Sequence, residues 1–501
     1  MTPRLDPARA RSTLLPAPSG LFGLALTALL ILIRGPKLLA DGDTYTHIFY
    51  GNWILENLRL PDTDFLSHTV QGTSWVIHEW GAQVLMGAVY QFAGLPGIAV
   101  LFATLAGLTL LTLYRLLEDL ETDPWLALAL MTVTLLLLYP TMLARPHLFS
   151  WLFGSLTLLI LTTRRNWLWV LPLLTVVWVN LHGGYILCLA LQAIYLAGGL
   201  LTDCAETDWR SALHRQQQPL LILLLSLLAT GLNPHGYALI GFYIEVSALD
   251  VTRHNPEWQA PDLQAHKILR VWLTLLLFAL LVKRQRPHWT NLLLLLFCLE
   301  AALTHRRHVS LIAMLLLPLW RELLQPIQDR IATWRAQTDQ RKQLICSGRT
   351  GPVMTLMLAA GLMLTANALP PTWQPHLQQM FPESELLPKK AWDYLVDNPP
   401  TGRVFNAYSW GAGLIYWSKG ELPVFIDGLT HKYGKQVYED YYQIAGLSEK
   451  AKELLDRYEI DWVLFPTAAP LTRYLLLTDE WQAIYRDDQA SVLVRSAPRG
   501  R

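Results

Sequence analysis

The chain has 501 residues, of which 52% are hydrophobic and 16% charged, and its mean hydropathy is +0.27. This composition excludes an ordinary soluble enzyme, because the apolar residues fall in runs long enough to cross a bilayer. The formal net charge of +1 gives no reason to expect nucleic acid, and the four cysteines lack the spacing of a zinc site or a disulfide framework.

Residues 1–20 are predicted to form a cytoplasmic tail. Arg4, Arg9 and Arg11 precede an apolar stretch that ends in "LLA" at Ala40, and a secretory signal shows the same order of features. Because about ten further apolar runs follow, we expect this stretch to be retained as a first transmembrane helix. The basic residues before it place the N-terminus in the cytoplasm.

Residues 21–369 are predicted to form a mostly α-helical, polytopic membrane domain of about eleven spans, several of them shorter than a straight span of ~20 residues. The segment Gly81–Ala93 is ambiguous, and the charge pattern fits better if it lies along the membrane surface. The predicted spans are Leu21–Leu39, Gly97–Leu117, Trp125–Tyr139, Leu148–Thr163, Trp167–Asn180, Gly184–Leu201, Leu220–Leu232, Ile268–Val282, Trp289–Thr304, Val309–Leu324 and Val353–Leu369.

The breaks between these spans are of two kinds. Breaks such as "TTRRNW" and "VKRQRPHW" are rich in Lys and Arg and are therefore expected in the cytoplasm. The alternate breaks are short and crowded with His, Asn, Arg and carboxylates. Each of them can simply end a helix, but so many on one side favour a shared polar cavity at the outer end of the bundle.

Residues 370–387 are predicted to form a Pro-rich linker, and residues 388–501 are predicted to form a small α/β domain. An odd number of spans places this domain outside the cytoplasm, on the side of the polar cavity. The predicted helices are Lys389–Asp397 and Ser448–Glu459, the latter with Ser448 as its N-cap, and the predicted strands are Arg403–Ala407, Pro423–Asp427, Asp461–Phe465, Trp481–Asp487 and Ser491–Arg495.

The first loop, residues 41–96, opens with the pair Asp41 and Asp43 directly after an apolar run. Such a pair can share a divalent cation such as Mg²⁺ or Mn²⁺ through hard oxygen ligands, or one member can take a proton from an acceptor hydroxyl. A structural alternative is that both residues only cap the interfacial helix predicted to follow, in which His47 comes one turn after Asp43.

An Asp-x-Asp pair at the end of the first span, followed by an amphipathic helix, resembles the GT-C class of polytopic glycosyltransferases. This class includes protein O-mannosyltransferases, aminoarabinose transferases and the catalytic subunit of oligosaccharyltransferase. The stretch "DGDTYTHIFYGNWIL" and the breaks "HEW", "RPH", "NLHGG", "NPHG" and "EW" are similar to a bacterial group of predicted GT-C membrane proteins. The likeness covers most of the chain, including "GRVFNAYSWGAGLIYW" and "VFIDG" near its end.

The resemblance implies transfer of a sugar from a polyprenyl-phosphate or polyprenyl-pyrophosphate donor to a glycan, lipid or protein acceptor outside the bacterial inner membrane. It assigns catalysis to Asp41 and Asp43, as base or as metal ligands. "SWGAGL" lacks the acid and the Tyr of the oligosaccharyltransferase acceptor motif, so recognition of a peptide sequon is not implied. Charge and hydrogen-bonding capacity suggest these residues for the substrate and its lipid phosphate: His47, His78, Glu79, Arg145, His147, His182, His235, Glu257, Arg306 and Arg307.

A transporter or flippase of a lipid-linked or anionic glycan is the alternative function. Transporters tend to place polar groups near the middle of the bilayer and to be built from repeated halves. The polar residues of this chain gather on one side of the predicted bundle, and no internal repeat is visible. The sequence therefore favours the transferase.

Overall fold

The structure is a computed structural model of the whole chain. The residues it describes are 11–16, 20, 22–23, 25–28, 37–248, 257–283, 286–338, 345–348, 387–429 and 432–496.

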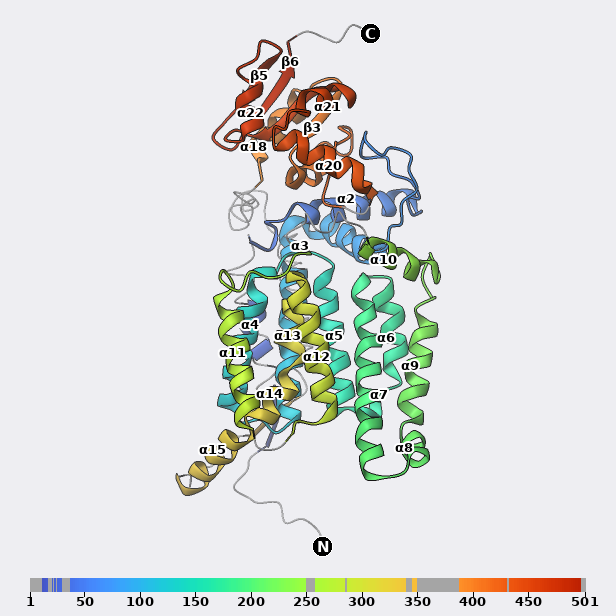
Figure 1. The fold of residues 1–501 in the computed structure, drawn as a ribbon, viewed down its shortest axis with the longest axis vertical. Coiled ribbons are helices and arrows are strands. Elements are labelled where there is room, and N and C mark those ends of the chain that lie inside the picture. The colour runs from blue at the N-terminus through green and yellow to red at the C-terminus, as the bar shows by residue number, and fades with distance from the viewer. Residues whose placement is uncertain are drawn as a thin grey trace.

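A bundle of helices forms one end of the molecule, and a small mixed domain forms the other (Figure 1). Within the described residues, three helical segments are long and apolar enough to cross a membrane: Trp80–Asp119, Pro124–Thr141 and Gly183–Glu206. Shorter apolar helices pack beside them, so the chain is an integral membrane protein. The helices are α3 (Trp80–Asp119), α4 (Pro124–Leu138), α5 (His147–Thr163), α6 (Val170–Val179), α7 (Ile186–Glu206), α8 (Trp209–Arg215), α9 (Gln217–Ala229), α10 (Ala238–Ala248), α11 (Lys267–Val282), α12 (Trp289–Thr304), α13 (Val309–Leu315), α14 (Leu317–Leu323) and α15 (Gln325–Thr338).

Each span predicted between Gly97 and Leu324 coincides with helix, although the last one is divided. The division falls at Leu316, between α13 and α14, because Pro318 has no N–H to continue the helical hydrogen bonds. The predicted span Val353–Leu369 lies outside the described residues and Leu21–Leu39 is described only in part, so the total of about eleven stays a prediction.

The ambiguous segment before Gly97 belongs to the first part of α3. Gly94 breaks the helix with φ 60° and ψ −160°, and Pro96 follows it. The part before this break packs against α2 (Gly42–Asn57), which lies across the end of the bundle (Figure 1). A Cβ at Gly87 would lie 2.6 Å from the backbone carbon of Gly51, so the two helices cross at a contact that only glycines allow.

The C-terminal domain is built on a mixed sheet of strand order β3-β4-β6-β5. Strands β3 and β4 are parallel, and β4–β6 and β6–β5 are antiparallel. The elements are α18 (Lys389–Asp397), β3 (Arg403–Asn406), α19 (Gly411–Trp417), α20 (Gly434–Ala445), α21 (Ala451–Arg457), β4 (Ile460–Pro466), α22 (Pro470–Leu475), β5 (Trp481–Arg486) and β6 (Ala490–Arg495). Near the other end of the chain, β1 (Arg11–Pro16) pairs in parallel with β2 (Ile345–Gly348).

Two of the elements predicted in this domain differ from the structure. The helix expected to begin at an N-cap Ser448 begins at Ala451, because residues 448–450 form a turn in which the amide of Ala451 donates to the carbonyl of Ser448. The strand expected at Pro423–Asp427 is not part of the sheet. It makes an isolated bridge from Val424 to Ser67 of the first loop instead.

The first loop shares a hydrophobic core with the C-terminal domain. Tyr45 and Tyr50 of α2, with Leu66 and Trp75 further along the loop, are buried in the same cluster as the sheet. The helices of the bundle form a separate cluster. α2 therefore lies between the two parts of the molecule and contacts both.

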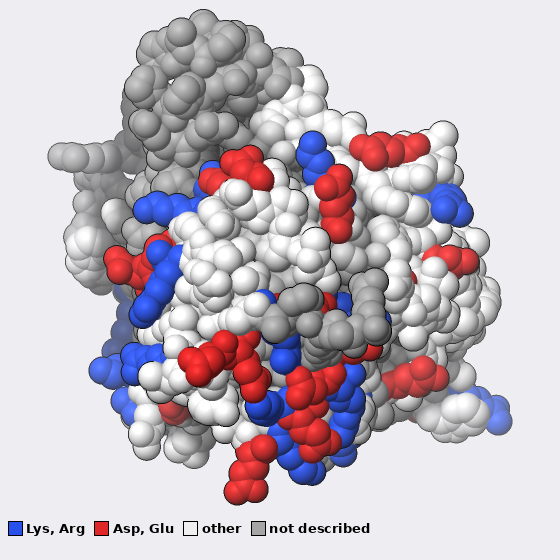
Figure 2. Space-filling model, turned by 90° about the horizontal axis from the view of Figure 1, so that it is seen from above, with Lys and Arg blue, Asp and Glu red and all other residues white. Residues whose placement is uncertain are grey.

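The surface seen from the end that carries the C-terminal domain has acidic and basic side chains interspersed (Figure 2). The Lys- and Arg-rich breaks at α8 and α15 lie at the opposite end of the bundle (Figure 1). The basic breaks and the C-terminal domain are thus separated along the length of the bundle. Which end faces the cytoplasm stays a prediction.

Candidate active site

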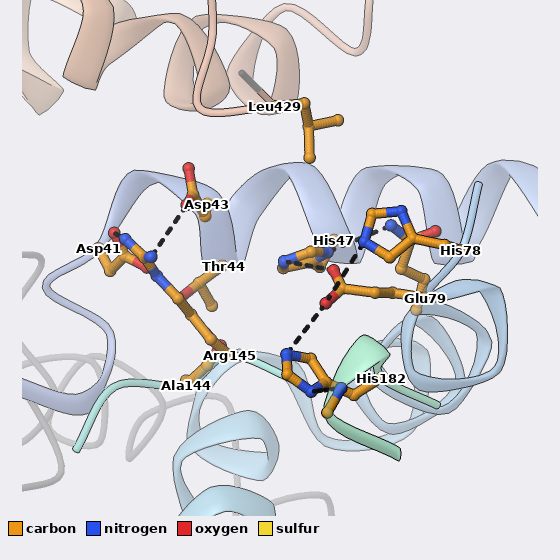
Figure 3. A network of polar contacts seen from close by, with 12 residues as sticks. Asp41, Asp43, Thr44, His47, His78, Glu79, Ala144, Arg145, His182 and Leu429 are labelled. Carbon is orange, nitrogen blue, oxygen red and sulfur yellow. Dashed lines mark hydrogen bonds and ion pairs between the residues drawn. The ribbon is translucent and has the colours of Figure 1, made fainter. Parts of the chain in front are cut away.

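The start of α2 is joined to the break before α5 by a two-point ion pair. Asp41 occupies the N-cap position, but its side chain makes no capping bond to the helix. Both of its oxygens contact Arg145 instead: Nε of Arg145 pairs with Oδ2, and Nη2 with Oδ1 at 2.6 Å. Thr44 donates to the carbonyl oxygen of Ala144 at 3.1 Å and holds the same two segments together (Figure 3). Helix capping by the Asp41 side chain is therefore not what this residue does.

Two further carboxylates reach the same guanidinium. Nη1 of Arg145 lies 3.2 Å from Oδ2 of Asp43 and 3.1 Å from Oε1 of Glu257. The breaks that contain Asp41, Asp43, Arg145 and Glu257 are far apart in the sequence, and the fold brings them to one point. Three carboxylates around one arginine leave this group with an excess of negative charge when all are ionised.

The surroundings of Asp43 change its acidity. Burial raises the pKa of the Asp43 carboxyl to about 7, against the opposing effect of Arg145. A carboxyl with this pKa is divided between its two forms near neutral pH, which suits a group that must both accept and release a proton.

A second group of polar side chains lies beside the first, centred on Glu79. The Nε2 atoms of three histidines face its carboxyl group: His182 at 3.4 Å, His47 at 3.7 Å and His78 at 3.9 Å (Figure 3). Burial raises the pKa of Glu79 to about 8 and lowers the pKa of His47 to about 3 and of His78 to about 4. At neutral pH the group is therefore mostly uncharged.

Buried neighbours fix the orientation of these rings. The amide of Gly184 donates to Nδ1 of His182 at 2.9 Å, so the ring proton lies on Nε2 and points at Glu79. Ser150 contacts the same Nδ1 at 2.7 Å and itself accepts from the indole of Trp178 at 2.7 Å. The sequence analysis did not predict Ser150 or Trp178 as site residues, because both lie inside apolar spans.

His47 is held by a partner that the sequence analysis also missed. Nε2 of Gln83 lies 3.2 Å from Nδ1 of His47. Gln83 is 2% exposed and stands one helical turn after Glu79 on α3. A side-chain amide four residues after Glu79, on the same face of the helix, was the signal that could have found it.

Backbone of the C-terminal domain covers the start of α2. A Cβ at Gly428 would collide with the carboxylate of Asp43, and one at Gly42 would lie 2.7 Å from the carbonyl oxygen of Ser409. Leu429 lies above the helix that carries Asp43 and His47 in Figure 3. Gly428 and Ser409 stand in the two C-terminal stretches that carried the family resemblance, and both meet Asp41–Asp43.

The remaining predicted site residues divide between the two groups and their surroundings. Arg307 is half-buried, with its guanidinium 4.6 Å from the ring centre of Trp258, and its charge acts on Glu257 and Glu79. Arg306 is exposed. His147 bonds through Nε2 to the carbonyl of Thr141 at 2.9 Å, and the amide of His235 donates to Oδ1 of Asn233 at 2.8 Å in a local turn.

The described residues do not fit a bound metal ion as they lie. They contain no cluster of three or more His, Cys, Asp or Glu arranged to hold one. Between Asp41 and Asp43, where the sequence analysis left open a shared cation, lies the guanidinium of Arg145. His182 offers a proton rather than a lone pair toward Glu79. Use of Mg²⁺ or Mn²⁺ stays an untested prediction, and no step below depends on it.

No protein-family model and no curated protein sequence matches this chain. Solved structures do. The apo oligosaccharyltransferase of Archaeoglobus fulgidus superposes with a TM-score of 0.53 at 12% identity, over 95% of this chain and 74% of that one. The chain has a GT-C-like fold.

Two other structures of the Archaeoglobus fulgidus oligosaccharyltransferase give the same result. The complex with an inhibitory peptide and a dolichol-phosphate matches with a TM-score of 0.53 at 12% identity, over 89% of this chain and 69% of that one. The form tethered to an acceptor peptide with the NVT sequon matches with a TM-score of 0.53 at 13% identity, over 95% and 74%. The likeness in fold to GT-C membrane glycosyltransferases expected from the sequence is thus confirmed.

Replacing Arg145 by Gln should destabilise the protein by about 1.5–3 kcal/mol, because it removes charged hydrogen bonds and leaves neighbouring carboxylates unbalanced. Thermal unfolding of the purified protein in detergent measures this. Arg306→Gln, at an exposed arginine, is the control and should unfold like the wild type. Equal unfolding temperatures for Arg145→Gln and the wild type would contradict the ion-pair geometry.

Proposed function

We propose that this protein is a membrane glycosyltransferase that moves a sugar from a polyprenyl-phosphate-linked donor to an acceptor outside the cytoplasm. The observation that carries the proposal is the meeting of Asp41, Asp43, Arg145 and Glu257 at the end of a helix bundle, beneath the C-terminal domain. The sequence resemblance assigns catalysis to Asp41 and Asp43, and their meeting with an arginine and a third acid in a GT-C-like fold supports that assignment.

Asp43 is the proposed base. Its carboxylate accepts the proton of the acceptor nucleophile, which attacks the anomeric carbon of the sugar. The bond from that carbon to the phosphate oxygen breaks, and the lipid phosphate leaves with the bonding electrons. A pKa near 7 allows Asp43 to be ionised before the reaction and protonated after it.

Arginine side chains are proposed to stabilise the leaving phosphate. Arg307 interacts electrostatically with Glu257 and Arg145, so the two guanidinium groups lie in one neighbourhood. Guanidinium groups bind phosphate oxygens through paired, charge-assisted hydrogen bonds. The Archaeoglobus fulgidus oligosaccharyltransferase has been solved with a dolichol-phosphate, which supports a polyprenyl-linked phosphate as the donor group here.

The Glu79 group is proposed to bind the uncharged part of the donor. Because its acid is mostly protonated at neutral pH and its histidines are neutral, the group offers hydrogen-bond donors and acceptors without strong charge. Sugar hydroxyls match such a surface better than a phosphate does.

Asp43→Asn should fold normally and lose transfer by roughly 100-fold or more, the scale of a lost general base. A carboxyl below its pKa cannot accept a proton, so wild-type kcat/KM should rise with pH through about 7 and level off above it. The variant should lack this rise. The assay uses purified protein with polyprenyl-phosphate sugars.

Asp62→Asn is the matched control, because Asp62 is an exposed carboxylate in the same loop. It should keep wild-type transfer and the same pH dependence. Near-normal transfer by Asp43→Asn at equal expression, or a rise with pH that survives the substitution, would show that the base is another group.

Arg307→Ala should weaken binding of a polyprenyl phosphate by about 1.5–3 kcal/mol, because this is the cost of losing a charge-assisted hydrogen bond. Arg306→Ala should have a smaller effect, because Arg306 is exposed whereas Arg307 is half-buried beside Glu257. Binding is measured by titration of a short-chain polyprenyl phosphate into detergent-solubilised protein. If Arg306→Ala weakens binding as much as Arg307→Ala, the assignment of Arg307 is wrong.

A further inference from the structure

A buried lysine joins the C-terminal domain to the first loop. Nζ of Lys432 lies 2.9 Å from Oδ1 of Asp64 and 2.8 Å from Oδ2 of Asp427, and all three side chains are 0% exposed. Asp427 precedes Gly428, the residue that covers Asp43, and Asp64 belongs to the first loop. The lysine thus joins the Asp427–Gly428 segment, called the cover below, to the loop that carries Asp43.

Both carboxylates of this ion triad (Lys432, Asp64, Asp427) have further partners. The amide and hydroxyl of Ser67 donate to Oδ2 of Asp64 at 3.0 and 2.5 Å, and the amide of Leu429 donates to Oδ1 of Asp427 at 2.9 Å. Burial opposes the charge of Lys432, but the Asp427 carboxylate and its neighbours hold the pKa of the lysine well above its usual value. The triad is therefore charged and fixed in position.

Main-chain bonds extend the junction on both sides of the triad. The amide of Val424 donates to the carbonyl of Leu66 at 2.9 Å, and the amide of His68 donates to the carbonyl of Val424 at 3.0 Å. Asn406, 0% exposed, accepts from the amide of Phe425 at 2.8 Å and so connects this segment to β3. The segment from Val424 to Gly428 is held by the sheet on one side and by the first loop on the other.

These contacts are more than a surface association of two domains. A buried charge that loses one partner is strongly destabilising, so Lys432 and Asp64 can separate only at a high free-energy cost. Gly428 lies too close to Asp43 for any side chain, so a small displacement of the cover opens space at that carboxylate. A change in the position of the cover therefore changes the space around the Asp43 carboxylate.

We propose that Lys432 is a positioning residue, which holds the Asp427–Gly428 backbone of the C-terminal domain against Asp43 and thereby completes the reaction site. The proposal rests on the proposed function for its catalytic consequence only. The geometric part, that Lys432 controls the covering of Asp43, stands independently of which reaction the site performs.

The test compares Lys432→Met with Lys435→Met in the full-length protein. Lys435 stands in the same region, but its side chain is 58% exposed and pairs with an exposed Glu439, so it is the matched control. Carbodiimide labelling followed by peptide mass spectrometry reports the accessibility of Asp43. Hydrogen exchange of the peptides that contain Leu66–His68 and Val424–Gly428 reports the junction.

Lys432→Met should increase labelling of Asp43 several-fold and speed exchange in both peptides, whereas Lys435→Met should match the wild type. With a polyprenyl-phosphate sugar as substrate, kcat should fall roughly 10–100-fold, the cost of a reacting group displaced by about 1 Å, with little change in KM. Wild-type labelling, or a lower unfolding temperature with unchanged labelling and kcat, would overturn the proposal.

Gly428→Ala keeps the triad intact and tests the cover if Lys432→Met does not fold. Its added methyl group should displace the cover from Asp43 and increase labelling of that residue. Wild-type labelling of Gly428→Ala would overturn the proposal. If the wild-type protein transfers no sugar, the proposed function fails, and the labelling and exchange results still decide the role of Lys432.

Discussion

The ion pair between Arg145 and the carboxylates of Asp41, Asp43 and Glu257 is the interaction on which the arrangement of the site depends. It joins the start of α2 to the break before α5 and to the break before α11. Charges beside a bilayer are costly unless they are paired or face a site. The arginine lowers that cost for three acids at once. It also places the proposed base and a cation for the leaving phosphate within one network.

The C-terminal domain also contributes to the site. Its core includes side chains of α2 and the first loop, and its backbone covers Asp43 at Gly428. The acid pair therefore lies between the bundle below and the C-terminal domain above.

Hydropathy and charge predicted the spans between Gly97 and Leu324 and the polar character of one end of the bundle, because lipid imposes strict rules on length and charge. Partners could not be predicted. Arg145 and Asp41 are 104 residues apart, and Lys432 and Asp64 are 368 apart. No sequence period encodes which breaks meet, so the sequence left a cap, a metal ligand and a base open as roles for Asp41, and it did not point to Lys432.

A cryo-EM structure of the protein with undecaprenyl phosphate tests the central claim most directly, because the lipid phosphate is its own marker. We expect phosphate density beside Arg307 and Arg145, at the end of the bundle that carries the C-terminal domain and under the segment that contains Gly428. Phosphate density at the opposite, Lys- and Arg-rich end near α8 and α15, with none beside Arg145 and Arg307, would contradict the account.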